Sequence, residues 1–206
     1  MTYSFAVIFA HGERPEEDSR LALELANKAV ALDDEFAQAH SALGLAYTVT
    51  GHHDEAIDCV RRAIELQPGD ADAQLFCSFS HMFAGQMRDA YDAINTALRL
   101  DPQYVKGPYL NILGIICFFM GNYEEAMDAF KRNVERGGPL AQPALAFRAA
   151  ACGASGFVED AKESAEALLN FFPAFSSSRF PILRIFKRPE DRERAIEGLR
   201  KAGLPD

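Results

Sequence analysis

Residues 37–70 read AQAHSALGLAYTVTGHHDEAIDCVRRAIELQPGD, and this stretch decides the fold because its pattern recurs along the chain. Its small and turn-forming residues return about 34 residues further on, first as Gly44, Gly51, Ala56 and Pro68 and then as Ser78, Gly85, Ala90 and Pro102. A period of that length in a sequence rich in helix formers predicts stacked helical hairpins.

Each repeat contains two helix patterns. Apolar residues fall at helical spacing over residues 38–50, and a glycine stops the run. A second pattern starts at Asp54 and ends before Pro68, which cannot continue a helix. The two helices form an antiparallel hairpin, and we expect Gly44 to face Ala56 because a large side chain at the crossing would hold the backbones apart.

At these positions the chain resembles the tetratricopeptide repeat family. The matching residues are Leu43, Gly44, Tyr47, Ala56, Val60, Ala63 and Pro68, with His40 where Trp is common; then Gln74, Cys77, Ser78, His81, Ala90, Ile94, Ala97 and Pro102; then Leu110, Leu113, Gly114, Cys117, Ala126, Phe130 and Asn133; and finally Leu145, Ala149, Cys152, Ala161, Ala165, Leu168 and Pro173. Asn133 and Leu168 stand where the family usually has Ala. The resemblance implies an all-α, right-handed superhelical solenoid of antiparallel helix pairs with a C-terminal capping helix.

We expect one solenoid domain over residues 1–206. Its predicted parts are a degenerate amino-terminal repeat (1–36) that includes a short helix over residues 2–10, four repeats (37–70, 71–106, 107–141 and 142–175) with an insertion at 104–107, and a capping segment (176–206). Within the last part, Pro189 and Gly203 are placed to begin and end a helix.

Three local features refine this picture. Asp70 is a predicted helix N-cap, and Asn122 with Glu125 resembles a capping box. Residues 109–120, YLNILGIICFFM, are apolar on every face, so that helix needs cover from more than its two neighbours.

The carboxyl end adds a second resemblance. ALELANKAVALDD, RLDP, the GNYEEA turn and RPEDRERAIEGLRKAGLP are similar to the tetratricopeptide arrays at the carboxyl end of bacterial class III adenylate or guanylate cyclases and related winged-helix regulators. Neither a cyclase catalytic domain nor a winged helix is present in these residues, so neither activity is carried over. The resemblance implies a regulatory or oligomerising array of a bacterial signalling protein as an alternative function.

Composition excludes several classes of partner. The net charge of −9 argues against nucleic acid held through its phosphates. Residues 176–206 hold eight basic and five acidic residues, a balance of +3, which leaves −12 for residues 1–175. No apolar run approaches the roughly 18 residues that span a bilayer, and MTYSFAVIFA lacks the basic start and cleavage pattern of a secretory signal. We therefore expect a cytoplasmic protein with neither a membrane nor a nucleic-acid partner.

The residues that could carry chemistry have structural explanations. Cys59, Cys77, Cys117 and Cys152 fall on apolar repeat positions and are interpreted as buried thiols, with no ligand spacing for a metal. His40 and His81 occupy aromatic core positions, whereas His52, His53, Asp54 and Glu55 are expected in an exposed turn. We expect no catalysis and no cofactor.

The predicted function is therefore binding of another protein. In a stack of such hairpins the first helices line the concave side, which gives a peptide-binding set of Leu45, Thr48, Val49, Leu75, Phe79, Met82, Phe83, Asn111, Ile115, Phe118 and Phe119. This mostly apolar groove suits an apolar or amphipathic peptide or helix, and only Asn111 hints at a clamp for a terminal carboxylate. Two alternatives stay open: the groove forms a homo-oligomer contact, or the amino-terminal segment or the tail, including Phe180, Ile182, Leu183, Ile185 and Phe186, folds back and fills it.

Overall fold

The computed structural model describes residues 15–103 and 108–206. Every regular element in these residues is helical, namely α2 to α11 and one 3-10 helix, η1, which confirms the predicted all-α fold. The chain divides into two compact units: unit 1 takes Met1–Gln103 and Ile185–Lys187, and unit 2 takes Tyr104–Arg184 and Arg188–Asp206. The single domain over residues 1–206 stays a prediction from sequence. The helix predicted over residues 2–10 and the insertion at 104–107 lie outside the described residues.

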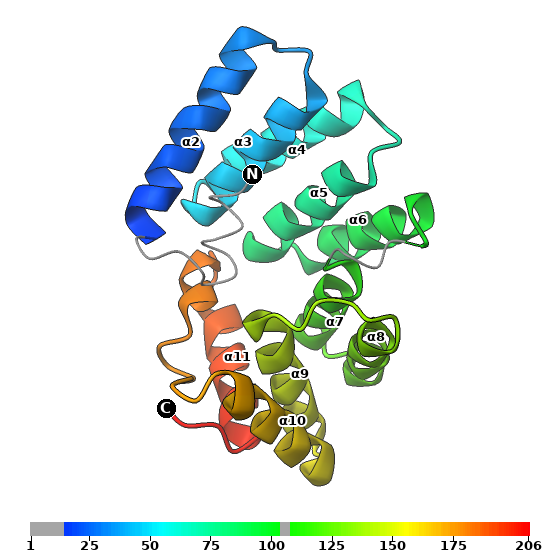
Figure 1. The fold of residues 1–206 in the computed structure, drawn as a ribbon, viewed down its shortest axis with the longest axis vertical. Helices are drawn as coiled ribbons and strands as arrows, with labels where there is room; N and C mark the ends of the chain where they lie inside the picture. Colours follow the sequence, from blue (N-terminus) through cyan, green and yellow to red (C-terminus); the bar gives the residue numbers. More distant parts are fainter. Residues whose placement is uncertain (1–14, 104–107) are drawn as a thin grey trace. The chain divides into compact units, whose positions relative to one another are not determined.

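Unit 1 is built from helical hairpins. Its helices are α2 (Pro15–Leu32), α3 (Ala37–Val49), α4 (His53–Leu66), α5 (Ala71–Phe83) and α6 (Met87–Leu100). α3 pairs with α4 and α5 with α6, and both α3 and α4 contact α5 (Figure 1). α2 packs on α3, where Ala22 and Ala26 meet Leu43 and Ala46. α2 thus takes the place of the second helix of the degenerate first repeat.

The predicted close crossing of α3 and α4 is present at Gly44. A Cβ atom at this position would lie 2.5 Å from Val60 Cγ1 and 3.1 Å from the carbonyl oxygen of Ala56. Gly44 therefore faces Ala56, as expected, and the absence of a side chain lets the two helices approach. In unit 2 the matching Gly114 lies against the ring of Phe130, where a Cβ would be 2.7 Å from Cζ.

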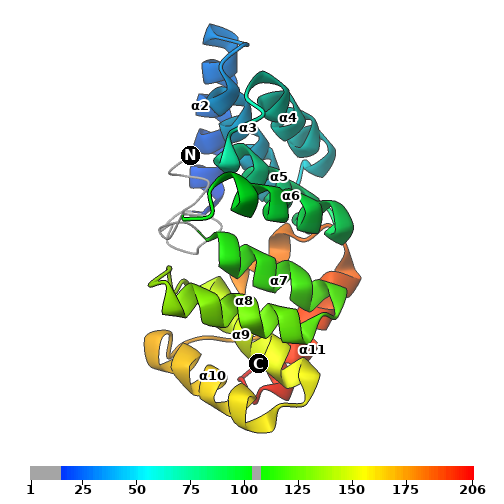
Figure 2. The ribbon, with the colours of Figure 1, turned by 90° about the vertical axis from the view of Figure 1, so that its right-hand side faces the viewer.

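Unit 2 continues the same construction. Its elements are α7 (Tyr109–Met120), α8 (Tyr123–Glu135), α9 (Gln142–Ser155), α10 (Val158–Phe171), η1 (Pro181–Ile185), whose last residue counts with unit 1, and α11 (Pro189–Lys201). α7 pairs with α8 and α9 with α10, and both α7 and α8 contact α9 (Figure 2). α11 packs on α9, so unit 2 ends in the predicted capping helix, with Pro189 at its start and Gly203 (φ 83°) just past its end.

The helix caps agree only in part with the sequence patterns. Asp70 caps α5, because its carboxylate accepts hydrogen bonds from the backbone N–H groups of Asp72 (2.9 Å) and Ala73 (3.2 Å). Asn122 precedes α8 at the expected position, but its side chain makes no capping bond, so the predicted capping box is wrong. Glu125 instead hydrogen-bonds the Cys117 thiol. That thiol lies one helix away from the cap, on α7.

The apolar helix α7 receives the additional cover that its sequence demands. Nearly all of its residues are buried, and it contacts α8, α9 and α11. From α11, Arg194 donates a hydrogen bond to the carbonyl oxygen of Phe119 (2.8 Å) and lies over the Phe118 ring, 5.9 Å from its centroid. Its guanidinium also donates to the hydroxyl of Tyr123 (3.2 Å).

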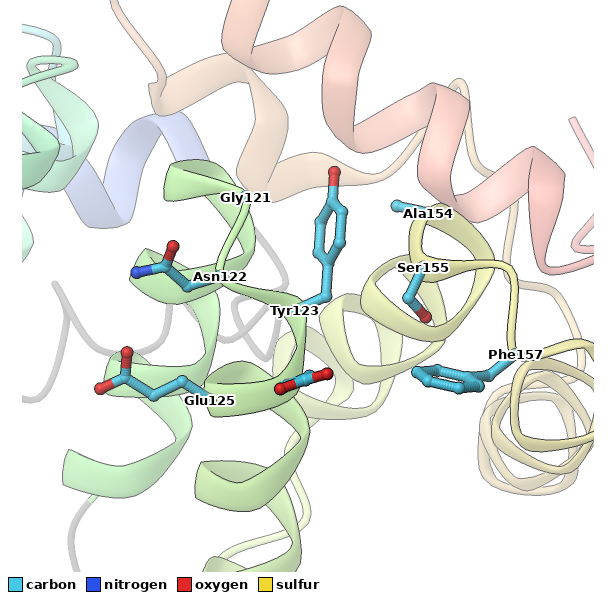
Figure 3. Close-up of a pocket in the computed structure, with 8 residues that line it drawn as sticks. Gly121, Asn122, Tyr123, Glu125, Ala154, Ser155 and Phe157 are labelled. Carbon is cyan, nitrogen blue, oxygen red and sulfur yellow. The ribbon is translucent and has the colours of Figure 1, made fainter.

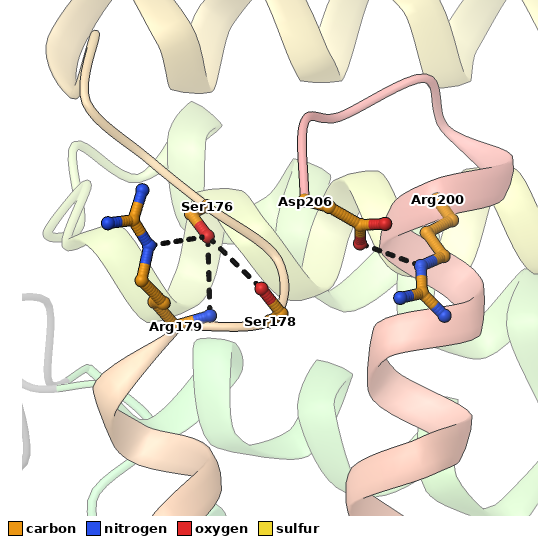
Figure 4. Close-up of polar contacts among 5 residues, drawn as sticks. All are labelled: Ser176, Ser178, Arg179, Arg200 and Asp206. Carbon is orange, nitrogen blue, oxygen red and sulfur yellow. Dashed lines mark hydrogen bonds and ion pairs between the residues drawn. The ribbon is translucent and has the colours of Figure 1, made fainter.

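Polar contacts fasten the last residues of the chain to unit 2 (Figure 4). The N–H of Ser177 donates to the carbonyl oxygen of Pro205 (2.8 Å), and Arg200 Nε lies 2.7 Å from a carboxylate oxygen of Asp206. Ser176 accepts hydrogen bonds from both the backbone N–H and Nε of Arg179. The segment before η1 and the carboxyl end are therefore held in place together with α11. No helix in the described residues is long and apolar enough to cross a membrane.

Candidate functional site

The predicted groove residues are packed inside the protein. Ten of the eleven are buried and Val49 is half-buried; the buried ones are Leu45, Thr48, Leu75, Phe79, Met82, Phe83, Asn111, Ile115, Phe118 and Phe119. These side chains therefore form no open trough in the described structure. Any partner reaches them only after the residues that cover them move away.

Part of this burial comes from contacts between neighbouring first helices. In unit 1 the hydroxyl of Thr48 on α3 donates to the carbonyl oxygen of Gly44 and lies 2.9 Å from the hydroxyl of Ser80 on α5. Ser80 in turn bonds the carbonyl oxygen of Phe76 (3.1 Å). These hydroxyls join α3 to α5, so Thr48 is a packing residue here and does not face a free surface.

The rest of the cover in unit 1 comes from a short piece of the carboxyl-terminal region. We call Ile185–Lys187 the tail segment, and His53, Asp54 and Phe83 the tail site. The Phe186 ring packs edge-on against Phe83, with ring centroids 4.7 Å apart. The backbone N–H of Lys187 donates to the carbonyl oxygen of Phe83 (2.8 Å), and its ammonium group lies 3.0 Å from Asp54 Oδ1. An aromatic anchor, a backbone hydrogen bond and an ion pair thus hold the segment.

The contacts differ in strength. Phe186 is 1% exposed, so its ring is removed from water, and burial of such a ring is worth about 1.5–3 kcal/mol. The side chains of Lys187 and Asp54 are 49% and 79% exposed, and exposed ion pairs contribute only ~0–1 kcal/mol. The aromatic ring therefore supplies most of the affinity, and the ion pair supplies charge selection.

His53 is the residue of this site that the sequence pattern misplaced. It was expected in an exposed turn, but it is the first residue of α4 and is buried, and its Nδ1 has no hydrogen-bond partner. Burial lowers the pKa of His53, and the nearby positive charge of Lys187 lowers it further, while Asp54 opposes this shift. The imidazole is therefore held in its neutral form next to the ammonium group of the tail segment.

Unit 2 has its own self-contained aromatic cluster. Phe118 and Phe119 on α7 contact Phe147 on α9, with centroid separations of 5.8 and 5.4 Å. Phe147 contacts Phe180 (5.9 Å), and Phe180 contacts Phe175 (5.2 Å). The residues before η1 thus contact α9 through Phe147, and all five tail residues of the folded-back alternative are buried. Of the alternatives left open by the sequence, the described structure shows the one in which the tail covers the groove.

The one polar residue of the predicted groove has a structural task. The amide of Asn111 donates a hydrogen bond to the carbonyl oxygen of Pro139 (2.8 Å), and the amide of Asn133 donates to the same oxygen (3.1 Å). Both asparagines are buried. They hold the connection between α8 and α9, which explains Asn133 at a usual Ala position and leaves Asn111 committed to that loop.

A hollow of about 620 Å³ in unit 2 lies between the α7–α8 turn and the α9–α10 turn (Figure 3). Its lining residues are Gly121, Asn122, Tyr123, Glu124, Glu125, Ala154, Ser155 and Phe157. Asn122 and Glu125 point away from Phe157 in the close-up, so the polar groups do not converge on one point. None of the predicted groove residues lines this hollow.

Three of the four cysteines are buried as predicted, whereas Cys59 is half-buried. Burial raises the pKa of Cys59 and of Cys77 to about 11 and that of Cys117 to about 12, and it also raises the pKa of Cys152. These thiols stay protonated and unreactive at neutral pH. His40 bonds the carbonyl oxygen of Asp34 and His81 bonds the side chain of Gln86, so both imidazoles have partners as expected. Both are half-buried and their hydrogen bonds are exposed, so neither is packed in the core as predicted.

Comparison with protein families places the repeats. Residues 37–70 match one tetratricopeptide repeat model, and residues 107–135 match another. The chain carries tetratricopeptide repeats. The first match coincides with the stretch on which the fold prediction was based, and the second covers α7 and α8. The likeness to cyclase-associated arrays stays a prediction from sequence.

Individual relatives support the same fold. The peroxisomal targeting signal receptor of Candida albicans is 31% identical over 86 residues, which are 42% of this chain but only 14% of the receptor. The crystal structure of TTC0263, a thermophilic TPR protein of Thermus thermophilus, is 16% identical with a TM-score of 0.66 and covers 89% of this chain and 92% of its own. The crystal structure of YrrB, a TPR protein with an unusual peptide-binding site, is 20% identical with a TM-score of 0.58. The match covers 87% of this chain and 91% of the YrrB chain. At these identities the solved structures establish the tetratricopeptide fold alone.

Proposed function

We propose that the chain is a non-catalytic scaffold that binds an apolar or amphipathic segment of a partner protein against its first helices. Tetratricopeptide repeats mediate contacts between proteins, and the relatives include a targeting-signal receptor and a peptide-binding protein. The observation that carries the proposal is the tail segment: a short peptide stretch already lies against α5 through an aromatic ring, a backbone bond and an ion pair.

This mode of binding has a direct physical basis. When the tail segment leaves, it uncovers Phe83 at the end of α5, and an incoming side chain that buries an area comparable to that of Phe186 gains about 1.5–3 kcal/mol. Two or three such anchors gain about 3–9 kcal/mol, part of which is offset by the cost of association and of ordering the peptide, so the contact is weak and exchangeable. The acidic balance of residues 1–175 disfavours nucleic acid as the partner.

A peptide-display selection against the intact chain tests the proposal. We expect enrichment of sequences with apolar or aromatic residues, and we expect Val49→Glu, at the half-buried groove position on α3, to weaken the selected peptides at least about tenfold, or ~1.4 kcal/mol. Val158→Glu is the matched control, since this valine lies on α10 and is 72% exposed. A selection that enriches nothing above background, or an equal loss in both folded variants, overturns the proposal.

Self-association remains the second candidate. Leu32 and Phe36, at the end of α2 and the entry to α3, are 80% and 51% exposed, and such apolar side chains on one turn favour contact with another surface. Light scattering over a concentration series tests this reading. A constant monomer mass would refute it, whereas an oligomer that Leu32→Ser and Phe36→Ser abolish would support it.

A further inference from the structure

The tail segment has the features of a bound ligand. Its contacts include three made by consecutive groups: the Phe186 ring, the Lys187 backbone N–H and the Lys187 ammonium. The receiving groups come from two helices, Phe83 at the end of α5 and Asp54 in the first turn of α4. Residues 184 and 188, on either side of the segment, count with unit 2. The segment therefore belongs to unit 1 through the contacts of residues 185–187 themselves and not through those of the residues that flank it.

We propose that the tail site is a recognition site for a partner segment in which an aromatic residue is followed directly by a lysine or arginine. The tail segment is the resident occupant of this site, and a partner binds by replacing it. This inference rests on the proposed scaffold function and specifies the class of segment that the scaffold accepts. The recognised pair is an aromatic ring against Phe83 and a cation against Asp54.

Charge at the site selects a basic residue and rejects an acidic one. Asp54 and Glu55 both lie in the first turn of α4 and are exposed. A carboxylate placed at the position of the Lys187 ammonium would lie about 3 Å from Asp54, and like charges at that distance repel. His53 does not supply a compensating cation, because burial keeps its imidazole neutral.

The contacts of the segment also allow exchange. The ion pair of the tail segment is exposed and weak, so exchange depends on whether the buried Ile185 and Phe186 are replaced by comparable apolar side chains of a partner. While the segment occupies the site, the apparent affinity for a free peptide falls in proportion to the fraction of open site. A site that is open 1% of the time therefore binds a free peptide about a hundredfold more weakly than an unoccupied one.

The test uses the full chain and a labelled synthetic peptide, ILRIFKR, with the sequence of residues 182–188. Fluorescence anisotropy measures its binding to the wild type, to Lys187→Glu and to Phe186→Ala. We expect both variants to bind the peptide at least about tenfold more tightly than the wild type, because each weakens the resident occupant. Lys187 is exposed, so Lys187→Glu leaves folding intact and carries the test even where Phe186→Ala fails to fold.

Charge reversal supplies the matched control. In Lys187→Ser, which leaves the tail segment without a charge at this position, adding Asp54→Lys should weaken the ILRIFKR peptide and strengthen a peptide with glutamate in place of its lysine. Adding Asp58→Lys instead, at an exposed position one turn further along α4, should change neither. A peptide with alanine in place of its phenylalanine should lose binding throughout. Equal peptide affinity in the wild type and folded Lys187→Glu, or binding that ignores the phenylalanine or the charge at position 54, overturns the inference. If peptides from the display selection bind without the aromatic–basic pair, this inference is wrong but the scaffold function is supported. If the selection enriches no peptide, both are wrong.

Discussion

The crossing of α9 and α11 offers the sharpest test of how the capping helix is attached. A Cβ atom at Gly153 would lie 2.5 Å from the carbonyl oxygen of Gly198, 2.6 Å from the backbone nitrogen of Ala202 and 3.0 Å from the carbonyl carbon of Lys201. All three are backbone atoms, which cannot rotate away as a side chain can. Gly153→Ala should therefore force α11 as a whole away from α9.

The magnitude follows from two opposing effects. Overpacking of a close contact costs about 1–3 kcal/mol, and the rigid backbone partners place this site near the upper value. Replacing glycine by alanine inside a helix gains back at most about 1 kcal/mol. The net loss is about 2 kcal/mol, and for a chain of this length each 1 kcal/mol lowers the melting temperature by roughly 2–4 °C. We expect a decrease of about 4–8 °C on that scale.

Thermal melting by circular dichroism measures the effect, with Gly69→Ala as the matched control. Gly69 has open space around its Cβ position and lacks a positive φ, so the same substitution should change stability little or raise it slightly. Hydrogen exchange gives a local readout, because amides of α11 should exchange faster in Gly153→Ala than in the wild type. Equal melting temperatures for the two alanine variants, with unchanged exchange in α11, would refute the packing argument.

Three further predictions concern unit 1. Ala56→Leu should lower the free energy of unfolding by ~1–3 kcal/mol, because Ala56 is fully buried at the Gly44 crossing; urea denaturation should show this loss and show little for Glu65→Leu on the exposed face. Asp70→Ala should cost about 0.5–2 kcal/mol through the lost cap of α5, and no change in the same assay would contradict the capping role. The pKa of His53 lies below its unfolded value of 6.5, so the stability that the neutral imidazole contributes is complete above that pH and is lost as the pH falls below it. Melting temperatures measured from about pH 5 to about pH 8 should therefore depend less on pH in His53→Gln than in the wild type. An unchanged pH profile in that variant would rule out this role of His53.

Local features of the fold could be predicted because they repeat. The small residue at Gly44 and the turn glycine at Gly51 return in successive repeats, so each hairpin is specified by a few neighbouring residues. The structure places Gly44 against Ala56 and gives Gly51 a φ of 80°, as such a turn requires. The last helix could also be predicted, because the backbone preferences of Pro189 and Gly203 mark its start and its end.

The site was harder to predict because it depends on contacts between distant residues. The predicted peptide-binding set stays a prediction, and the burial of ten of its residues shows that a side chain of a first helix can be covered by a later segment. Phe83 is covered by Phe186, about a hundred residues away in sequence, and no periodic pattern encodes that pairing. The apolar character of the tail around Phe180 and the opposite charges of the tail and the array were the only signals for it.

The roles of two polar residues were mispredicted for a related reason. Asn111 looked like a ligand-binding amide, yet its partner is the carbonyl oxygen of Pro139, which becomes available only when the α8–α9 connection folds over α7. His53 looked exposed because its neighbours His52 and Asp54 are charged or polar. It is instead the buried first residue of α4, and the charge of Lys187, more than 100 residues away in sequence, acts on it.

Attachment of the tail segment to the same chain sets a threshold for any partner. A tethered ligand acts at an effective concentration that reaches the millimolar range for short flexible links, so a free peptide with the same contacts competes poorly at micromolar concentration. A partner therefore needs contacts beyond the aromatic–basic pair, and the half-buried Val49 on α3 is a position from which such contacts can extend. The occupied site consequently favours partners with several anchors over isolated aromatic–basic dipeptides, which are common in unrelated proteins. Weakening the occupant by Lys187→Glu should lower this threshold. The long selected peptide and the short ILRIFKR peptide should then gain affinity by the same factor relative to the wild type, because both need the open site. A gain confined to one of the two peptides would show that the segment does not compete with both for the site.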